Sequence, residues 1–207
     1  MSRRKKAGIV CFCVLAVGLA VWLDQTQAAK EKPRESRSKA SIGADDFEKY
    51  HGKIFRVIHV VDGDTLDIDI PDSDKHYTRI RLLGIDTPET KNTNQADYFG
   101  PEAEKAAFNL TTDKNVCVYL DTEENTRGYY GRLLAYVKLP DNRFLNEVLI
   151  SEGFGYADLR FRHSLYNRYT QLEASARSLK KGLWAEVMRE QLPEWLQKKK
   201  PKLLLKK

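Results

Sequence analysis

The chain has 207 residues, three cysteines and a formal net charge of +6 at pH 7. About 140 residues lie between an apolar N-terminus and a lysine-rich C-terminus, which is enough for one domain with a buried interior. Two of the three cysteines fall in the apolar N-terminal run, so the remainder of the chain has one cysteine and cannot form a framework of disulfides. The net charge is +3 for residues 1–28 and +6 for residues 197–207, which leaves −3 for residues 29–196. The net charge of the folded part therefore does not by itself attract polyanions such as nucleic acid.

The first 28 residues have the pattern of an export signal. Arg3–Lys6 is basic, Ala7–Leu23 has no charged residue, and Thr26–Ala28 offers small residues for cleavage. The uncharged run of 17 residues is long for a signal peptide and short for a spanning helix. Two alternatives stay open: cleavage near Ala28 makes the protein secreted or periplasmic, and retention anchors it in the membrane through residues 7–23, with the folded domain outside.

Composition divides the rest of the chain into three parts. Residues 29–48 are rich in Lys, Ser and Glu and predict a linker. Residues 49–186 hold the periodic apolar segments and predict the folded domain. Residues 187–207 predict a basic tail, which is either simply solvated or adheres to anionic lipid, cell wall or nucleic acid.

The folded part alternates between strand and helix patterns. Three helices are predicted, from Gly100-Pro101 onward, over Phe144–Glu152 and over Ser164–Lys181. Apolar, β-branched runs predict strands at about 54–61, 64–70, 76–85, 115–121 and 132–139. Five strands with a helix after the third predict an α+β fold, an OB-fold-like five-stranded β-barrel with three α-helices, preceded by the N-terminal hydrophobic segment.

The segment Arg81–Glu89 brings a guanidinium and two carboxylates to the end of an apolar strand. Arg81 and Asp86 are five residues apart, and this odd offset directs them to opposite faces of a regular strand. Gly84 and Pro88 favour a bend that would let them share one site. An isolated pattern of this kind is more simply explained as a surface ion pair.

Two other segments favour a reaction site over that simple explanation. Asp62 and Gly63 form the residue pair expected in a tight hairpin turn, so the turn explains them completely. Asp64 is not needed for the turn. Arg132 follows Tyr130-Gly131 where a loop enters a strand, and it adds a second guanidinium.

Together these segments resemble the staphylococcal (micrococcal) nuclease family, the thermonuclease-like phosphodiesterases. The resemblance extends from Ile54 to Trp184. It rests on D-G-D-T at 62–65, R-L-L-G-I-D-T-P-E at 81–89, Y-F-G-P-E-A at 98–103, Y-G-R at 130–132 and N-E at 146–147. The resemblance implies the same barrel and an exported calcium-dependent nuclease that cuts DNA and RNA at the 5′-oxygen side and leaves 3′-phosphate ends.

The candidate metal ligands are carboxylates. Asp64 and Asp86 are hard oxygen ligands of the kind that calcium prefers. The resemblance implies that the backbone carbonyl of Thr87 completes the protein's share of the calcium site. No other cofactor is expected.

The resemblance also assigns the reacting groups. It implies that Glu89 orients or deprotonates the attacking water, that Arg81 and Arg132 bind the phosphate, and that Tyr130 lies near the nucleotide. Arginine suits the role because its planar fork bonds two phosphate oxygens and keeps its proton. Residues 156–162 depart from the family pattern, because they replace its substrate-side aromatics.

Two rival functions belong to other classes. A catalytically inactive nuclease-like module would bind nucleic acid without cutting it, but such modules typically lose the carboxylates or arginines that this chain keeps. A binding protein that uses the face of the barrel would need stacking aromatics, and residues 64–83 offer only Tyr77. We therefore expect a monomeric enzyme with DNA and RNA as substrates and no obligate protein partner.

Overall fold

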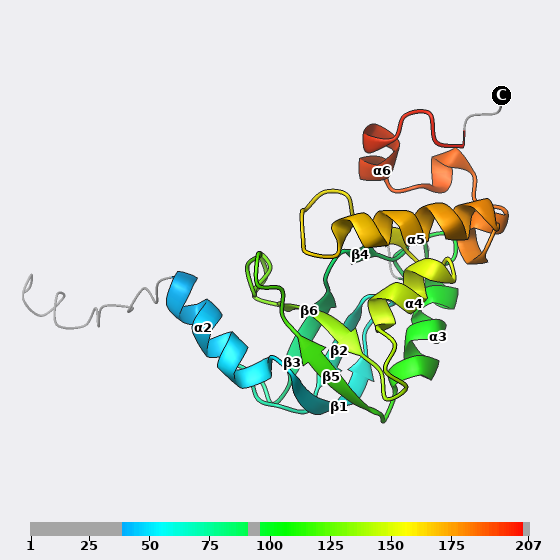
Figure 1. The fold of residues 1–207 in the computed structure, drawn as a ribbon. Helices are drawn as coiled ribbons and strands as arrows, with labels where there is room; N and C mark the ends of the chain where they lie inside the picture. The colour runs from blue at the N-terminus through cyan, green and yellow to red at the C-terminus, as the bar shows by residue number, and fades with distance from the viewer. Residues whose placement is uncertain (1–38, 91–95, 205–207) are drawn as a thin grey trace, which may run out of the picture. The chain divides into compact units, whose positions relative to one another are not determined.

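The computed structural model of the protein describes residues 39–90 and 96–204 (Figure 1). The signal or anchor predicted over residues 1–28 lies outside the described residues. None of the helices in the described part is long and apolar enough to cross a bilayer. The described elements belong to a compact unit of residues Ala40–Lys207.

Five strands close into a barrel in the order β1-β2-β3-β6-β5. They are β1 (Lys53–Val60), β2 (Thr65–Ile68), β3 (Thr78–Leu82), β5 (Asn115–Tyr119) and β6 (Leu133–Lys138). β3 and β6 pair in parallel, and the other neighbouring strands pair antiparallel. The interior is filled by residues such as Val57, Ile68, Ile80 and Val118, all with no exposed surface. The predicted OB-fold-like barrel is confirmed.

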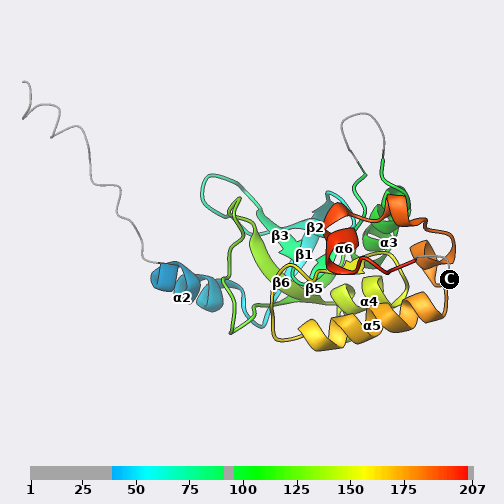
Figure 2. The same cartoon turned by 90° about the horizontal axis from the view of Figure 1, so that it is seen from above.

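The three predicted helices are present as α3 (Gly100–Thr111), α4 (Leu145–Ser151) and α5 (Tyr166–Ser178). They lie together on one side of the barrel in Figure 1, and Figure 2 shows the same grouping from above. A small antiparallel sheet of β4 (Ile85–Asp86) and β7 (Tyr156–Ala157) joins the end of the third strand pattern to the segment before α5. The fold is therefore α+β, as the sequence predicts.

A helix also forms before the barrel. α2 (Lys39–Tyr50) overlaps the predicted linker 29–48. Its Asp46 is buried and accepts hydrogen bonds from Thr126 Oγ1 (2.7 Å) and Arg127 Nε (2.8 Å). Because these partners are 80 and 81 residues away in the chain, the composition of the linker gives no sign of them. The contacts fix α2 to the loop that precedes β6.

The C-terminal part of the chain also packs against the domain. After α5 the chain forms the 3₁₀ helices η1 (Gly182–Ala185) and η2 (Arg189–Gln191), followed by α6 (Glu194–Lys199). Leu192 and Leu196 from this segment are buried in the common hydrophobic core. Residues 187–199, which the composition assigns to a basic tail, thus include buried apolar side chains.

Asn146 explains one of the sequence motifs in structural terms. It is fully buried in α4, and its Oδ1 accepts a hydrogen bond from the backbone N–H of Val137 (3.0 Å). Its Nδ2 donates to the carbonyl oxygens of Leu83 (3.0 Å) and Ala135 (3.3 Å). This one side chain therefore fixes α4 to β6 and to the residue after β3.

Replacing Asn146 with Ala should lower the free energy of unfolding by about 3 kcal/mol, because the Val137 N–H and the Leu83 carbonyl lose this buried partner at about 1–3 kcal/mol each, while the Ala135 carbonyl keeps the N–H of Leu83. Urea unfolding followed by circular dichroism measures the change. Asn115→Ala, at an exposed position of β5, is the matched control and should change stability by less than about 0.5 kcal/mol. Equal effects of the two substitutions would contradict the assigned role of Asn146.

Candidate active site

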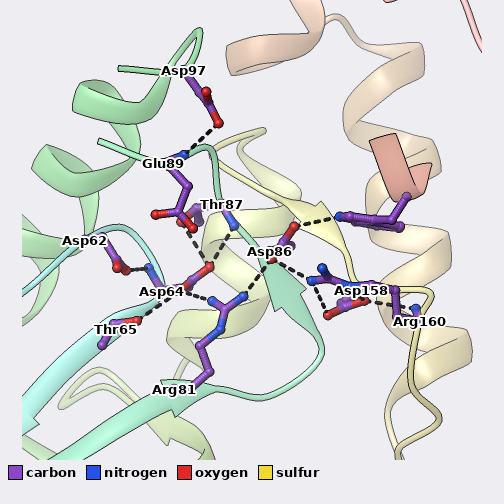
Figure 3. Close-up of polar contacts among 11 residues, drawn as sticks. Asp62, Asp64, Thr65, Arg81, Asp86, Thr87, Glu89, Asp97, Asp158 and Arg160 are labelled. Atoms are coloured by element: carbon purple, nitrogen blue, oxygen red, sulfur yellow. Dashed lines mark hydrogen bonds and ion pairs between the residues drawn. The ribbon is translucent and has the colours of Figure 1, made fainter. Parts of the chain in front are cut away.

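Strand register brings the first carboxylate next to the first guanidinium. In the β2–β3 pair, Thr65 lies opposite Arg81, and the backbone N–H of Leu82 donates to the carbonyl oxygen of Asp64 (2.8 Å). Asp64 directly precedes β2, so this pairing places it beside Arg81, and the two side chains form an ion pair. Figure 3 shows both side chains converging at the end of the barrel strands.

A bend at Gly84 brings the second carboxylate to the same place. Gly84 has φ +77°, which ends the third predicted strand at Leu82. A Cβ atom on Gly84 would lie 2.4 Å from the ring of His163, so only glycine fits there. After the bend, Asp86 Oδ1 accepts a hydrogen bond from Arg81 Nη2 (2.7 Å). The bend thus removes the conflict that the odd offset of these two residues creates.

Asp64 is held by the residue that follows Asp86. Its Oδ2 accepts hydrogen bonds from Thr87 N (2.8 Å) and Thr87 Oγ1 (3.1 Å). Its Oδ1 accepts one from Thr65 Oγ1 (3.2 Å). Both Asp64 and Thr87 are buried. The two candidate carboxylates are therefore tied together through Thr87 and Arg81.

The Asp-Gly pair of the preceding loop acts differently from the sequence expectation. Gly63 is not among the glycines with positive φ, so the pair does not form the left-handed hairpin turn expected of it. Asp62 instead closes the loop with its side chain, which accepts a hydrogen bond from the N–H of Asp64 (3.0 Å). A Cβ atom on Gly63 would lie 2.7 Å from Thr87 Oγ1. Glycine is needed here so that Thr87 can reach Asp64.

Asp86 has two partners that the sequence does not predict. Its Oδ1 also accepts a hydrogen bond from Arg160 Nη2 (2.8 Å), and its Oδ2 accepts one from Trp195 Nε1 (2.8 Å). Arg160 lies in the segment 156–162 that departs from the family pattern, which is the one sequence signal that could have indicated it. Trp195 lies in α6 and has no such signal.

Glu89 lies beyond the bend, at the open side of the cluster. Its backbone N–H is held by Asp97 Oδ2 (3.3 Å), while its side chain is exposed (Figure 3). Partial desolvation, followed by the charge of Asp62, raises the pKa of the Glu89 carboxyl above its usual value. Burial likewise raises the pKa of Asp62, against the opposing charge of Arg81. Asp62 therefore belongs to the electrostatic environment of the site, which the sequence reading overlooked.

Arg132 and Tyr130 lie at the rim of this cluster. The Arg132 guanidinium is 6.0 Å from the centre of the Tyr130 ring. Within the described part of the chain, neither side chain forms an ion pair or hydrogen bond with the candidate carboxylates. The charge of Arg132 acts on Arg81 and Asp62 without direct contact. The Tyr130 side chain is 80% exposed and available to a ligand.

The residues present fit a hard divalent cation. Asp64 and Asp86 are hard oxygen donors that lie on either side of the buried Arg81 guanidinium. The carboxylates of Asp62, Asp64, Asp86, Glu89 and Asp158 outnumber the guanidiniums of Arg81, Arg132 and Arg160 in this cluster. An excess of carboxylates favours a bound hard cation such as calcium. No group of three or more His, Cys, Asp or Glu side chains in the described ranges is placed to hold a metal ion by itself, so carbonyl and water oxygens would have to complete a site built on Asp64 and Asp86.

Comparison with known proteins places the chain among the staphylococcal nuclease homologues. Residues 79–186 match the family model described as staphylococcal nuclease homologue. The chain is 37% identical over 133 residues to a thermonuclease of Staphylococcus hyicus, and this match covers 63% of this chain and 75% of that protein. It is 40% identical over 109 residues to a thermonuclease of Staphylococcus intermedius, a match that covers 51% of this chain and 60% of that protein. It is 33% identical over 148 residues to an uncharacterized endonuclease of Escherichia coli, covering 68% and 82%.

Replacing Gly84 with Ala should destabilise the fold by more than the same change at Gly131. Both glycines have positive φ, +77° and +75°, but only a Cβ on Gly84 meets another side chain. The backbone strain costs about 1–3 kcal/mol at either position, and the contact with His163 adds to it at Gly84 alone. Chemical denaturation of both variants measures the difference. Equal losses would show that the His163 contact does not constrain the bend.

Proposed function

This chain belongs to the staphylococcal nuclease family, and we propose that it is an exported, calcium-dependent nuclease that hydrolyses DNA and RNA. Cleavage takes place at the 5′-oxygen side of the phosphodiester and leaves 3′-phosphate ends. Export is supported by the basic and apolar pattern of residues 1–28, and the chemistry is supported by the cluster around Arg81.

The buried position of Arg81 between Asp64 and Asp86 is the observation that carries the proposal. Burying a guanidinium is costly unless charged partners compensate for the lost water, and these two carboxylates do so. Arg81 Nη2 is already bound to Asp86 at 2.7 Å, so the guanidinium is fixed with its other nitrogen beside Asp64. A phosphate oxygen bound by the cation that these carboxylates would hold comes to lie beside this guanidinium, which the two ion pairs already orient. We therefore assign Arg81 to the phosphate of the substrate.

Asp64, Asp86 and the carbonyl of Thr87 are the residues that would hold calcium. When bound, calcium supplies positive charge next to a phosphate oxygen and stabilises the charge that develops in the transition state. The protein contributes the orientation. Thr87 holds Asp64 through two hydrogen bonds, and Arg81 bridges both carboxylates.

Glu89 is the candidate general base. Its raised pKa makes its carboxylate a stronger base than an ordinary glutamate, so it accepts a proton from water more readily near neutral pH. Its exposed position at the open side of the cluster leaves room for a water between it and the phosphate. The second guanidinium, Arg132, stacks on the Tyr130 ring and makes no ion pair among the described residues, so it can bind the same phosphate, while Tyr130 offers a ring for the adjacent nucleotide.

The full chain should degrade DNA and RNA in the presence of calcium and lose this activity when a chelator is added. Magnesium should support little activity, because it demands octahedral geometry and retains its waters, whereas calcium accepts two carboxylates and irregular oxygen ligands. Gel assays with single- and double-stranded substrates measure the activity. A polymerase should extend the products only after phosphatase treatment, which tests for 3′-phosphate ends. Binding without cleavage under all conditions would support the inactive-module alternative instead.

Glu89→Gln and Arg81→Lys should each lower turnover by about 100- to 1000-fold, because each removes a preorganised contact to the transition state. Lysine cannot reproduce the bidentate geometry of the guanidinium. The matched controls are Glu48→Gln and Arg56→Lys, at exposed positions of α2 and β1, and both should retain wild-type turnover. Circular dichroism checks that all four variants are folded. A turnover near wild type for either site variant would withdraw its catalytic role.

A further inference from the structure

The C-terminal helix α6 contributes a side chain to the candidate site. α6 begins after residue 186, where the match to the family model ends. From this helix, Trp195 Nε1 donates a hydrogen bond of 2.8 Å to Asp86 Oδ2. The helix is fixed by the buried side chain of Leu196 and by Lys200, whose Nζ donates to Glu173 Oε1 (3.1 Å). The contact with Asp86 is therefore part of a packed arrangement.

The indole of Trp195 is itself held in place by Arg160. The guanidinium of Arg160 lies 4.8 Å from the centre of the indole ring, a cation–π contact. Arg160 is fixed in turn by two hydrogen bonds to Asp158, from Nε (2.9 Å) and Nη2 (2.8 Å), and Nη2 also donates to Asp86 (2.8 Å). Trp195, Arg160 and Asp86 therefore each contact the other two, and Asp158 holds Arg160 in this arrangement.

The hydrogen bonds of Asp86 leave one direction for a further ligand. An ionised carboxylate has about four acceptor positions, two on each oxygen. Oδ1 accepts from two guanidiniums, those of Arg81 and Arg160, and among the described residues Oδ2 accepts only from Trp195. One position on Oδ2 stays available. Its direction is set by the indole N–H that occupies the other position on the same oxygen.

We propose that Trp195 is a positioning residue that orients Asp86 Oδ2 toward the divalent cation. The inference rests on the cation site of the proposed function. Hydrogen bonds to metal-ligating carboxylates orient them, and loss of such a bond typically costs about 10- to 100-fold in metal affinity. The nuclease site of this chain thus extends beyond the segment that defines the family and includes its C-terminal helix.

Trp184 provides a matched control within the same chain. Its Nε1 is buried and makes no hydrogen bond with the described residues, and its ring packs edge-on against Tyr156. Trp184→Phe removes an indole N–H that does nothing for Asp86, whereas Trp195→Phe removes the one that donates to it. Phenylalanine keeps an aromatic ring in both places.

The test is calorimetric titration of the full chain with calcium alone. Trp195→Phe should bind calcium about 10-fold more weakly than the wild type, while Trp184→Phe should bind with unchanged affinity. Calcium should also change the tryptophan emission of the wild type and of Trp184→Phe, but not of Trp195→Phe. Urea unfolding of each variant separates a loss of packing from a loss of affinity.

Each other outcome overturns the inference in a distinct way. Unchanged calcium affinity in Trp195→Phe, with or without lower stability, would assign the indole to packing only. Tighter binding would show that the N–H competes with the cation instead of orienting its ligand. A wild-type chain that binds no calcium would overturn both this inference and the proposed cation site, whereas normal calcium binding by wild type and variant alike would overturn only the role of Trp195.

Discussion

The guanidinium of Arg81 links two carboxylates that reach it from different parts of the chain, and the rest of the site depends on this link. Asp64 arrives by the pairing of β2 with β3, and Asp86 arrives by the bend at Gly84. Two carboxylates at such close quarters repel each other unless a cation lies between them. The guanidinium supplies that charge in the fold, and burial lowers the pKa of Arg81 while the charge of Asp86 opposes this shift.

Glycines permit the close approaches on which this arrangement depends. At Gly84 the backbone takes a left-handed conformation beside the ring of His163, and at Gly63 the missing Cβ leaves space for Thr87. Thr87 then donates twice to Asp64, so the loop before β2 and the turn after β4 are fixed to each other. Close packing of the backbone at the end of the barrel thus positions Asp64 and Asp86, and the barrel strands provide the rigid support for these loops.

The helices at the two ends of the domain, α2 and α6, contact the segments that form the candidate site, although their composition suggests solvated tails. α2 inserts the buried carboxylate of Asp46 between Thr126 and Arg127, next to the loop that carries Tyr130 and Arg132. α6 places Trp195 on Asp86. Both ends are rich in lysine and look solvated when read along the chain, because each buries only a few residues. Those few residues are in contact with the segments that form the candidate site.

The sequence by itself determined the barrel, its three main helices and the motifs of the staphylococcal nuclease family, because alternating and helical periodicity and local residue order carry that information. It also indicated the bend at Gly84, since glycine after an apolar strand and proline shortly beyond it are local signals. Only the tertiary structure decided the role of Gly63 as space for Thr87, the place of Asp62 in the charge cluster, and the contacts of Arg160 and Trp195 with Asp86. Trp195 lies 109 residues from Asp86 in the chain, and no local pattern reports a contact that forms only when distant segments pack together.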